Sequence, residues 1–465
     1  MKKQIFHIET LGCKVNQYES DGIASCLEEK GLIRGDKKST ADYCIINTCA
    51  VTSKAGMQSR QAIRKIIRDN PNSKIIVTGC HAQTDRDQIS KIDNIDQIVC
   101  HKDKTLIAEL VAELIAEQIP GQTLEHANVQ ASDKKMDQTS IFPPSPFVFQ
   151  PPDHSKKNRF LSFDKPVKGS MSRAYLKIQD GCNAFCTYCI VPYARGSSVS
   201  MPESEVFNHL EGLVQSGFKE VIVTGIHTGM YGLDLKPPTS LLKLIETMDK
   251  QKSVDRVRIS SIEPTEISDA LIDLAAPGHI LCDHFHIPLQ SGDDEILKKM
   301  KRPYSVSFFE EVIFKIHEKL PLGGIGVDTI IGFPSETDEQ FENTYSLIKK
   351  LPISYLHVFP FSARKGTPAY HFQEKVPSEV IKERCARMRK LGQEKQTAFI
   401  LANQGKILQG LVQKTEDRQS GFLKAVTSNY LTISLKTDEA LKGKLVDLKF
   451  DQWESGADLM GHVID

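Results

Sequence analysis

Short apolar runs alternate with amphipathic stretches along the first quarter of the chain. Four runs, QIFHIETLG, YCIINTC, KIIVTGC and IDQIVC, have the pattern of strands, and helical patterns such as SRQAIRKIIRD separate them. Because strands that alternate with helices pack as a parallel sheet covered on both faces, residues 1–132 are predicted to form a doubly wound α/β domain.

The same alternation returns in the middle of the chain, after an interruption. Residues 133–167 contain SDKKMDQTS and FPPSPFVFQPPD, whose prolines exclude both a helix and a central strand. We predict a partly extended linker there. Residues 168–400 then carry six strand patterns, AYLKIQD, EVIVTG, VRISSI, HFHIPL, IGVDTIIGF and SYLHVFPF, with helical stretches between them. Six such units predict a partial (β/α)6 barrel.

Two helices of this region are marked by local features. Thr337 and Gln340 in SETDEQF fit a capping box, which predicts a helix start directly after the fifth strand. A basic amphipathic segment, VPSEVIKERCARMRKLGQEKQTAFI, closes the region. Residues 401–465 contain short strand patterns instead and are predicted to form a small all-β barrel.

Composition excludes several classes of protein. At 465 residues the chain is far too long for a disulfide-stapled mini-protein. Lysine plus arginine and aspartate plus glutamate number 59 each, which is unlike a nucleic-acid coat or a membrane-surface protein. The N-terminal apolar stretch is broken by Glu9 and too short for a signal sequence, so we expect a cytoplasmic location. In that compartment the eleven cysteines stay reduced and are available for metal.

Three cysteines of the first domain follow predicted strands directly: Cys13, Cys49 and Cys80. The carboxyl ends of parallel strands meet at one edge of a sheet, so these thiols are expected to converge. A zinc site, a redox centre or an iron–sulfur cluster would each fit, and spacing alone does not choose between them. The other cysteines of the domain, Cys26, Cys44 and Cys100, are expected to be structural.

A second set is more specific. Cys182, Cys186 and Cys189 form the sequence CNAFCTYC, directly after the first predicted barrel strand. Barrel sites lie at the carboxyl ends of the strands, and three cysteines at this spacing fit one loop around the corner of an iron–sulfur cluster. A cluster held by three cysteines leaves one iron open to the amino and carboxylate groups of a ligand, which favours radical chemistry.

At this loop the chain resembles the radical S-adenosylmethionine enzymes, and as a whole it resembles their methylthiotransferase family. The supporting segments are TLGCKVNQYES, INTCAVT, QDGCNAFCTYCIVPYARG, SSIEPTEI, HIPLQSGDDEILKKMKRPY, DTIIGFPSETDEQF and HVFPFSARKGTPA. The resemblance covers nearly the entire chain, with an N-terminal methylthiotransferase domain, a radical barrel and a C-terminal TRAM RNA-binding barrel.

The resemblance implies two [4Fe-4S] clusters. Cys182, Cys186 and Cys189 would hold the radical cluster, and the three strand-end cysteines of the first domain would hold an auxiliary cluster that carries the sulfur. One S-adenosylmethionine would methylate this sulfur. A second would be cleaved to a 5′-deoxyadenosyl radical, which starts replacement of the adenine C-2 hydrogen by a methylthio group. An electron donor such as flavodoxin or ferredoxin is also implied.

The cofactor is expected among residues at the ends of the barrel strands. The candidates are Tyr188, Gly225, His227, Ser261, Glu263 and Gln290. His284 and His286 share one strand face and are expected to be hydrogen-bonded interior residues. Glu263 and Asp328 are equally open to a structural role as partners of arginines.

Contact with RNA is predicted for two regions. Arg60, Arg64 and Arg68 share one helix face, and residues 54–74 hold six basic residues against one acidic residue, a net charge of +5. A solvated charged face would show the same pattern. The C-terminal barrel has eight basic against nine acidic residues, so its RNA role follows from the resemblance. Its candidates for base contacts are Phe422, Asn429 and Tyr430, although aromatic residues in a small barrel are more often core.

The substrate branch depends mainly on one loop. TLGCKVNQ resembles the branch that acts on threonylcarbamoyladenosine beside the tRNA anticodon, so the expected partner is a tRNA carrying that nucleoside. Residues 197–201, SSVSM, depart from the arginine-rich stretch usual there and resemble the isopentenyladenosine branch better. A ribosomal-protein aspartate is a further alternative within the family. An iron–sulfur RNA-binding sensor without catalysis is the alternative of another class, although a sensor has no need of a cluster with an open iron.

Overall fold

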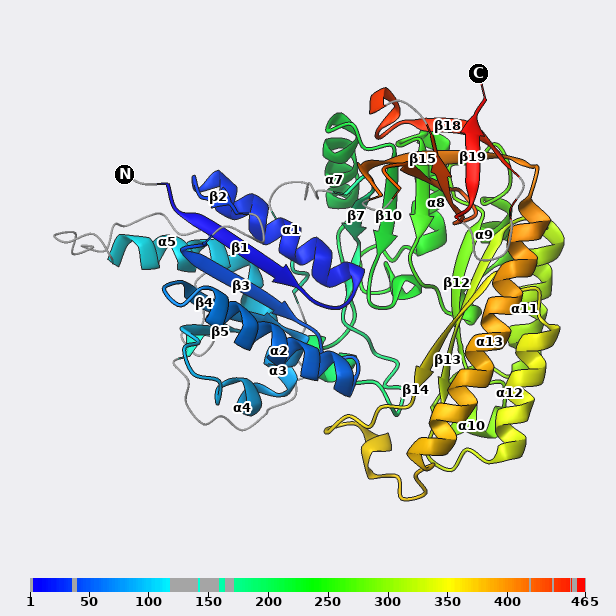
Figure 1. Ribbon diagram of the computed structural model, residues 1–465, viewed down its shortest axis with the longest axis horizontal. Coiled ribbons are helices and arrows are strands. Elements are labelled where there is room, and N and C mark those ends of the chain that lie inside the picture. Colours follow the sequence, from blue (N-terminus) through cyan, green and yellow to red (C-terminus); the bar gives the residue numbers. More distant parts are fainter. Residues whose placement is uncertain are drawn as a thin grey trace. The chain divides into compact units, whose positions relative to one another are not determined.

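The computed structural model describes residues 3–35, 40–117, 141–142, 159–163, 171–417, 420–436, 439–451, 453 and 458–464. The chain divides into two compact units (Figure 1). Unit 1 comprises Met1–Lys168, Asp180–Ala184 and Cys189–Val199, and unit 2 comprises Gly169–Gln179, Phe185–Tyr188 and Ser200–Asp465. Within the described residues, no helix is long and apolar enough to cross a membrane.

Unit 1 is built on a sheet of six strands in the order β2-β1-β3-β4-β5-β6. These strands are β1 (Ile5–Thr10), β2 (Ile33–Arg34), β3 (Tyr43–Thr48), β4 (Lys74–Gly79), β5 (Gln97–Val99) and β6 (Ile141–Phe142). All neighbours pair in parallel except β6, which is antiparallel to β5. The order reverses direction between β1 and β3, and such a switch point opens a crevice at the carboxyl ends of the strands.

Helices cover this sheet on both faces (Figure 1). They are α1 (Lys14–Glu29), α2 (Ser53–Asp69), α3 (Cys80–Thr84), α4 (Arg86–Ile89), the 3-10 helix η1 (His101–Leu106) and α5 (Ile107–Glu117). Every residue of β3 is buried, as expected of a central parallel strand whose two faces are both covered. Ile63 and Ile66 of α2 pack with Cys44 and Ile46 of β3. The doubly wound domain is therefore confirmed.

The linker predicted over residues 133–167 falls mostly outside the described residues. Ile141–Phe142 lies within it and adds the edge strand β6 to the sheet of unit 1. Phe163 is buried, and its ring meets that of Tyr18 edge-on at a centroid distance of 6.0 Å.

Unit 2 contains six parallel strands that form a partial (β/α)6 barrel, called the half barrel below. Its strands are β7 (Ala174–Lys177), β10 (Glu220–Thr224), β11 (Arg256–Ile259), β12 (His284–Gln290), β13 (Gly324–Ile331) and β14 (Tyr355–Pro360). They form the parallel sheets β11-β10-β7 and β12-β13-β14. The parallel bridges Val257–Leu281 and Ser261–His286 join β11 to the β12 side. These six strands confirm the predicted partial barrel.

Helices follow the barrel strands and cover their outer face. They are α7 (Glu203–Gln215), α8 (Leu241–Gln251), α9 (Asp269–Asp273), α10 (Asp294–Lys299), α11 (Val306–Lys319), α12 (Asp338–Lys350) and α13 (Ser378–Asn403). Three short 3-10 helices are η2 (Thr228–Met230), η3 (Pro264–Glu266) and η4 (Pro368–His371). Helix α13 lies along β14 and α12 (Figure 1).

The predicted capping box at the start of α12 is present. The Gln340 N–H donates to Thr337 Oγ1 at 3.2 Å, and the Thr337 N–H donates to Gln340 Oε1 at 3.1 Å. These two bonds satisfy backbone donors that the first helical turn leaves unpaired.

The C-terminal strands close into a barrel in the order β15-β16-β17-β19-β18. They are β15 (Ile407–Glu416), β16 (Leu423–Thr427), β17 (Thr432–Leu435), β18 (Leu445–Phe450) and β19 (Met460–Val463), and the 3-10 helix η5 spans Glu439–Leu441. The patterns GKILQGLVQ, GFLKAVTS, NYLTISL and KLVDLKF predict the first four of these strands, and β19 is a fifth that they do not include. Helix α13 continues to Asn403, so the predicted boundary at residue 401 lies inside its last turn.

A buried ionic cluster attaches this barrel to the half barrel within unit 2. Glu220 of β10 accepts hydrogen bonds from Arg256 and Arg258 of β11, and all three residues are buried. The Arg258 guanidinium also donates to the backbone oxygens of Ser428 and Thr427, at 2.8 and 2.9 Å. Two arginines held by one carboxylate thus satisfy carbonyl groups of the C-terminal barrel.

Replacing Arg258 with leucine should loosen this attachment. Glu220 would lose one of its cationic partners, and the carbonyl groups of Thr427 and Ser428 would each lose one hydrogen bond, at a cost of about 3–5 kcal/mol. Hydrogen–deuterium exchange should show faster exchange in β16 and β17. The exposed Lys449 of β18 offers a control, because Lys449→Ala should leave exchange unchanged. Equal exchange in Arg258→Leu and the unmodified protein would contradict the prediction.

The attachment should also be insensitive to pH in the neutral range. Burial raises the pKa of Glu220, but Arg258, Arg256 and Arg173 outweigh it and hold the pKa at about 2. The pKa of an unfolded glutamate is about 4.3. Because the folded value is the lower one, this stabilisation is full above the unfolded pKa and is lost as the pH falls toward 2. Protection of β16 and β17, corrected for intrinsic exchange, should therefore be constant from about pH 5 to pH 8.

Candidate active site

The three strand-end cysteines of unit 1 lie where the sheet opens. Cys13 directly precedes α1, Cys49 follows β3, and Cys80 is the first residue of α3. Strands β1, β3 and β4 are neighbours, so the cysteines follow three adjacent carboxyl ends at the switch point. A Cβ on Gly12 would lie 2.7 Å from Cys49 Sγ, which shows how closely the loop before Cys13 approaches Cys49.

The electrostatics of these thiols fit a cation-binding site. Burial raises the pKa of the Cys49 thiol to about 11, and the neighbouring Cys80 and Cys13 add to this effect by charge repulsion. Three adjacent thiolates therefore need a cation to hold them deprotonated, and iron bound to sulfur supplies one. Of the cysteines expected to be structural, Cys44 is buried in β3 and Cys26 lies in α1. Cys100 Sγ lies 3.9 Å from Arg86 Nη1 as a hydrogen-bond acceptor.

The second cysteine set lies in the loop after β7. Gly181 at its start has φ +68°, and a Cβ there would lie 2.1 Å from the Ser197 carbonyl oxygen, so this close approach requires glycine. Phe185 adopts φ +48°, an unusual conformation for a non-glycine residue and a sign of a tightly constrained loop. Cys182 Sγ accepts a hydrogen bond from the Ala184 N–H at 3.4 Å.

Within unit 2, the part of the loop around Cys186 is held by the barrel. Thr187 Oγ1 donates to the Lys299 carbonyl at 2.8 Å, and the Thr187 N–H donates to the Met300 carbonyl at 3.1 Å. Cys186 is buried, and its sulfur accepts a hydrogen bond from Arg302 Nη1 at 3.4 Å. Donors aimed at sulfur suit a thiolate or a cluster ligand.

Arg302 is a site residue that the sequence analysis missed. Its guanidinium bonds Cys186, pairs with Glu263 and donates from Nε to the Tyr304 hydroxyl at 3.0 Å. Burial alone would lower the pKa of Arg302, but Tyr188, Tyr304, Glu263 and Cys186 raise it, so the residue stays cationic. A cation and a carboxylate side by side next to Cys186 complement the two charges of an amino acid. The segment KKMKRPY gave no periodic signal that singled out this arginine.

The predicted cofactor residues of unit 2 follow successive strands. Gly225 and His227 follow β10, Ser261 and Glu263 follow β11, and Gln290 ends β12. Gln290 has φ +68°, at an irregularity in the pairing of β12. These residues therefore lie at the carboxyl end of the half barrel, where barrel sites form.

Two of the predicted cofactor residues, His227 and Tyr188, also make contacts within the fold. His227 bonds Glu266 at 2.6 Å, and its backbone N–H donates to Gln179 Oε1 at 2.8 Å. Tyr188 packs against an apolar cluster that includes Met300 and Phe333.

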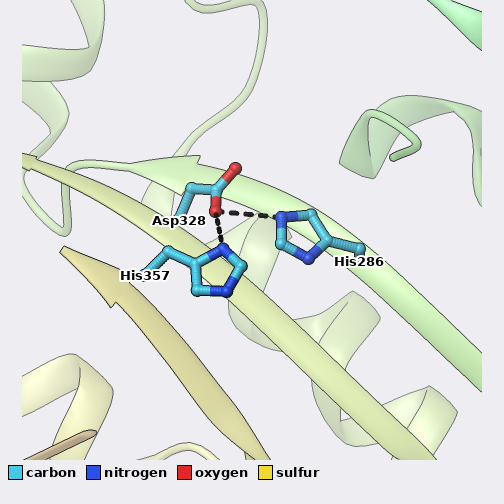
Figure 2. Close-up of side chains that lie close together, drawn as sticks. All are labelled: His286, Asp328 and His357. Carbon is cyan, nitrogen blue, oxygen red and sulfur yellow. Dashed lines mark hydrogen bonds and ion pairs between the residues drawn. The ribbon is translucent and has the colours of Figure 1, made fainter. Parts of the chain in front are cut away.

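A group of polar side chains lines the neighbouring strands. Figure 2 shows the Asp328 carboxylate of β13 between the imidazoles of His286 and His357, from β12 and β14. Asp328 Oδ1 lies 2.9 Å from His286 Nε2 and 3.2 Å from His357 Nδ1. Burial raises the pKa of Asp328, but the bonds from the two histidines outweigh it and lower the pKa to about 2. Asp328 is thus paired with histidines, whereas the arginine partner weighed from the sequence is found at Glu263.

Tyr355 extends this chain of hydrogen bonds. Its hydroxyl lies 2.8 Å from His284 Nε2 and 3.1 Å from His286 Nδ1. A hydroxyl has one proton, so Tyr355 donates to one histidine and accepts from the other. If Tyr355 donates to His286 Nδ1, then His286 Nε2–H donates to Asp328 and every bond has a proton. These contacts agree with the expectation that His284 and His286 are hydrogen-bonded interior residues.

The arginines predicted to bind RNA lie on α2, away from its buried face. Arg64 and Arg68 are exposed, whereas Arg60 is half-buried and its Nη1 lies 3.1 Å from His81 Nε2. Arg68 also contacts Asp69 at 3.2 Å. Arg64 and Arg68 therefore have the exposure that a phosphate contact needs, and Arg60 is partly committed to His81.

Two of the predicted RNA residues in the C-terminal barrel are used for packing instead. Asn429 is 1% exposed, and its amide nitrogen donates to the Leu322 carbonyl at 2.7 Å and to Asn403 Oδ1 at 2.8 Å. Tyr430 stacks on His284 at a centroid distance of 4.4 Å, below the guanidinium of Arg258. This placement corrects the expectation of a base contact for these two residues, because both side chains attach the C-terminal barrel to the half barrel within unit 2. Phe422 is half-buried in the turn before β16.

Two family models match the chain. One is described as "Uncharacterized protein family UPF0004" and matches residues 5–100, and the other is the radical SAM superfamily, which matches residues 176–348. A solved radical S-adenosylmethionine methyltransferase, TsrM from Kitasatospora setae, shares the fold with a TM-score of 0.53 at 15% identity, covering 79% of this chain and 77% of that chain. The fold and the cysteine loop thus define a radical S-adenosylmethionine protein with an added cysteine-bearing sheet.

Curated relatives narrow this class. Threonylcarbamoyladenosine tRNA methylthiotransferase MtaB of Bacillus subtilis is 36% identical over 96% of this chain and 92% of its own length. The protein of the same name from Aquifex aeolicus is 33% identical over 94% and 98%. A tRNA-2-methylthio-N(6)-dimethylallyladenosine synthase of Clostridium botulinum is 32% identical over 96% and 94%. The chain belongs to the radical S-adenosylmethionine methylthiotransferase family.

Proposed function

We propose that this protein inserts a methylthio group at C-2 of N6-threonylcarbamoyladenosine at position 37 of tRNA, beside the anticodon. The observation that supports the reaction is the presence of two three-cysteine sets, one at the switch point of the N-terminal sheet and one in the loop after β7. The substrate is supported by the names of the relatives from Bacillus subtilis and Aquifex aeolicus and by the TLGCKVNQ loop. As an enzyme it is a transferase of alkylthio groups.

The cysteines present fit two [4Fe-4S] clusters. Cys182, Cys186 and Cys189 would hold the radical cluster, and Cys13, Cys49 and Cys80 would hold the auxiliary cluster. When bound, these groups would supply an electron for cleavage of S-adenosylmethionine and the sulfur for insertion. The chain itself contributes the donors aimed at the cysteine sulfurs, such as Arg302 toward Cys186 and the Ala184 N–H toward Cys182.

S-adenosylmethionine would bind at the carboxyl end of the half barrel. Glu263 and Arg302 carry charges opposite to those of the amino and carboxylate groups of its methionyl part, and Arg302 lies next to Cys186. Among the other predicted residues, Tyr188, Gly225 and Gln290 would line the remainder of the cofactor. Ser261 and His227 follow the same strands.

The tRNA would contact both ends of the chain. Arg64 and Arg68 on α2, with a smaller contribution from Arg60, offer phosphate contacts, and Phe422 remains a candidate for stacking on a base. A cytoplasmic location follows from a tRNA substrate, and flavodoxin or ferredoxin would be the electron donor. We also propose the domain division 1–132, 133–167, 168–400 and 401–465, in which the last part is the TRAM domain.

Nucleoside mass spectrometry tests the substrate. The reconstituted enzyme, S-adenosylmethionine and a reductant are incubated anaerobically with tRNAs that carry either threonylcarbamoyladenosine or isopentenyladenosine. We expect the methylthio group on threonylcarbamoyladenosine. Product on isopentenyladenosine alone would contradict this branch and favour the alternative suggested by residues 197–201. Absence of any 5′-deoxyadenosine would instead favour the iron–sulfur sensor, and 5′-deoxyadenosine without a tRNA product would direct attention to the ribosomal protein.

A further inference from the structure

Arg195 is the centre of a buried polar network in unit 1. It is the last residue of the short helix α6 (Val191–Arg195), which begins two residues after Cys189, and it is 4% exposed. Its Nη1 donates to Glu19 Oε1 at 2.9 Å and to Asp180 Oδ1 at 2.8 Å. Its Nη2 donates to Asn16 Oδ1 at 2.7 Å. One guanidinium thus bonds the segment before Cys182 and the helix that follows Cys13.

The charges of this network balance. Lys104 is fully buried and bonds Glu19, so two cations, Arg195 and Lys104, face two anions, Glu19 and Asp180. Burial and Arg195 hold the pKa of His101 at about 4, against the opposite effect of Asp180, so this imidazole is neutral near pH 7. A buried network of this kind is stable only when every charge has its partner. The two carboxylates are therefore committed to cations of the chain itself.

The network also reaches β3, the strand that precedes Cys49. Lys104 Nζ donates to Asn47 Oδ1 at 3.1 Å, and Asn47 lies two residues before Cys49. The Asn47 amide donates to the Asn16 carbonyl at 3.0 Å. These hydrogen bonds hold Asn16, Asn47 and Glu19 together. They thereby also hold the neighbouring loops that carry Cys13 and Cys49.

Apolar packing completes the attachment of α6. Ile190 and Ala194 form one buried cluster with Ala50 and Cys80, and Tyr193 packs against it. Helix α6 lies against α3, which begins at Cys80. Burial acts to lower the pKa of Arg195, but the charges of Asp180, Cys80, Glu19 and Cys13 outweigh it and raise the pKa, so the guanidinium stays cationic and interacts with the same cysteines. Arg195 therefore lies close to the auxiliary cysteines while belonging to the radical loop.

We propose that Arg195 is a positioning residue that fixes the segments flanking Cys182 and Cys189 to the auxiliary cysteines and sets the charge around the auxiliary cluster. The proposal rests on the proposed function, because it takes both cysteine sets as cluster ligands. The cation stabilises added negative charge nearby, so it favours the reduced auxiliary cluster. Arg195 also holds the two sets of cysteines in a fixed arrangement. Sulfur insertion depends on such an arrangement of the reacting groups, so Arg195 raises the fraction of cofactor cleavages that end in sulfur insertion.

The test compares Arg195→Gln, which removes the charge, with Arg195→Lys, which retains it without the fork of donors. Both holoenzymes are titrated electrochemically without substrate, and the potential of each cluster is followed by electron paramagnetic resonance. We expect a more negative auxiliary potential in Arg195→Gln and a smaller change in Arg195→Lys. With tRNA, the ratio of methylthiolated nucleoside to 5′-deoxyadenosine should fall about tenfold to a hundredfold in Arg195→Gln.

Two further variants keep this test decisive. If Arg195→Gln does not fold, Arg195→Gln with Asp180→Asn removes one charge of each sign and restores the balance. This double variant should show the same fall in the product ratio, because the fork of donors is lost, and only a small change in the auxiliary potential, because the two lost charges have opposite effects on it. Arg86→Gln is the matched control, since Arg86 is also buried in unit 1 but contacts Cys100, and it should leave both potentials unchanged. Unchanged potentials and an unchanged product ratio in the Arg195 variants would overturn the proposal. Failure of the proposed function would appear differently, as no methylthio product from the unmodified enzyme.

Discussion

Cys186→Ala should reduce formation of 5′-deoxyadenosine to background. Cys186 is the buried member of the CNAFCTYC set, and Arg302 donates to its sulfur. With this thiolate removed, two cysteines remain for a cluster that needs three, and Arg302 loses the sulfur that it faces. The measurement is anaerobic incubation with S-adenosylmethionine and dithionite, followed by chromatographic quantification of 5′-deoxyadenosine and of bound iron.

A matched control exists in the same unit. Cys385 is 1% exposed, lies on α13 and belongs to neither cysteine set. Cys385→Ala should therefore retain cofactor cleavage and iron content, with only the small loss of stability expected from a buried cysteine. If Cys186→Ala cleaved the cofactor at the rate of the unmodified enzyme, the assignment of the radical cluster would be wrong.

Periodicity and strand ends made much of this molecule predictable. Cys13, Cys49 and Cys80 could be grouped from sequence because each follows a strand, and parallel neighbours bring their carboxyl ends to one edge. The chain order of the six barrel strands placed Glu263 and Gln290 at one end for the same reason. These predictions needed the direction of each strand and no side-chain contact.

Contacts between distant segments could not be predicted in this way. Arg195 and Glu19 are 176 residues apart in the sequence, and no periodic pattern relates them. Arg302 lies 116 residues after Cys186, in a loop that carries several basic residues of similar appearance. Tertiary packing decides that Arg302 is the basic residue that faces Cys186, and a local sequence pattern does not encode this packing.

The C-terminal barrel shows how a correct fold prediction can accompany an incorrect role for a residue. Aromatic and amide side chains of a small barrel can stack on an exposed RNA base or bond its edge, which is the basis for predicting base contacts for Asn429 and Tyr430. Both side chains face the half barrel within unit 2, where Asn429 satisfies the Leu322 carbonyl and Tyr430 stacks on His284. Burial against a second domain is a property of the assembled chain, so the sequence of the barrel alone could not reveal it.

Cys49→Ala should separate the two halves of the proposed reaction. Cofactor cleavage needs the radical loop, which this change leaves intact, so 5′-deoxyadenosine should still form. Sulfur insertion needs the auxiliary set, and removal of Cys49 leaves Cys13 and Cys80 without the thiolate between their strands. Methylthiolated nucleoside should therefore fall below detection by mass spectrometry, and iron content should drop toward that of one cluster.

Cys44→Ala is the control for this experiment, because Cys44 lies five residues earlier, in the strand β3 that precedes Cys49, and is buried in the apolar core. It should retain both products, so a loss specific to Cys49 would not be an effect of altered packing in β3. Methylthiolation by Cys49→Ala at the level of the unmodified enzyme would show that the three strand-end cysteines do not hold the sulfur-donating cluster. Loss of 5′-deoxyadenosine in Cys49→Ala, with cleavage intact in Cys44→Ala, would instead mean that cofactor cleavage itself requires the auxiliary cysteines.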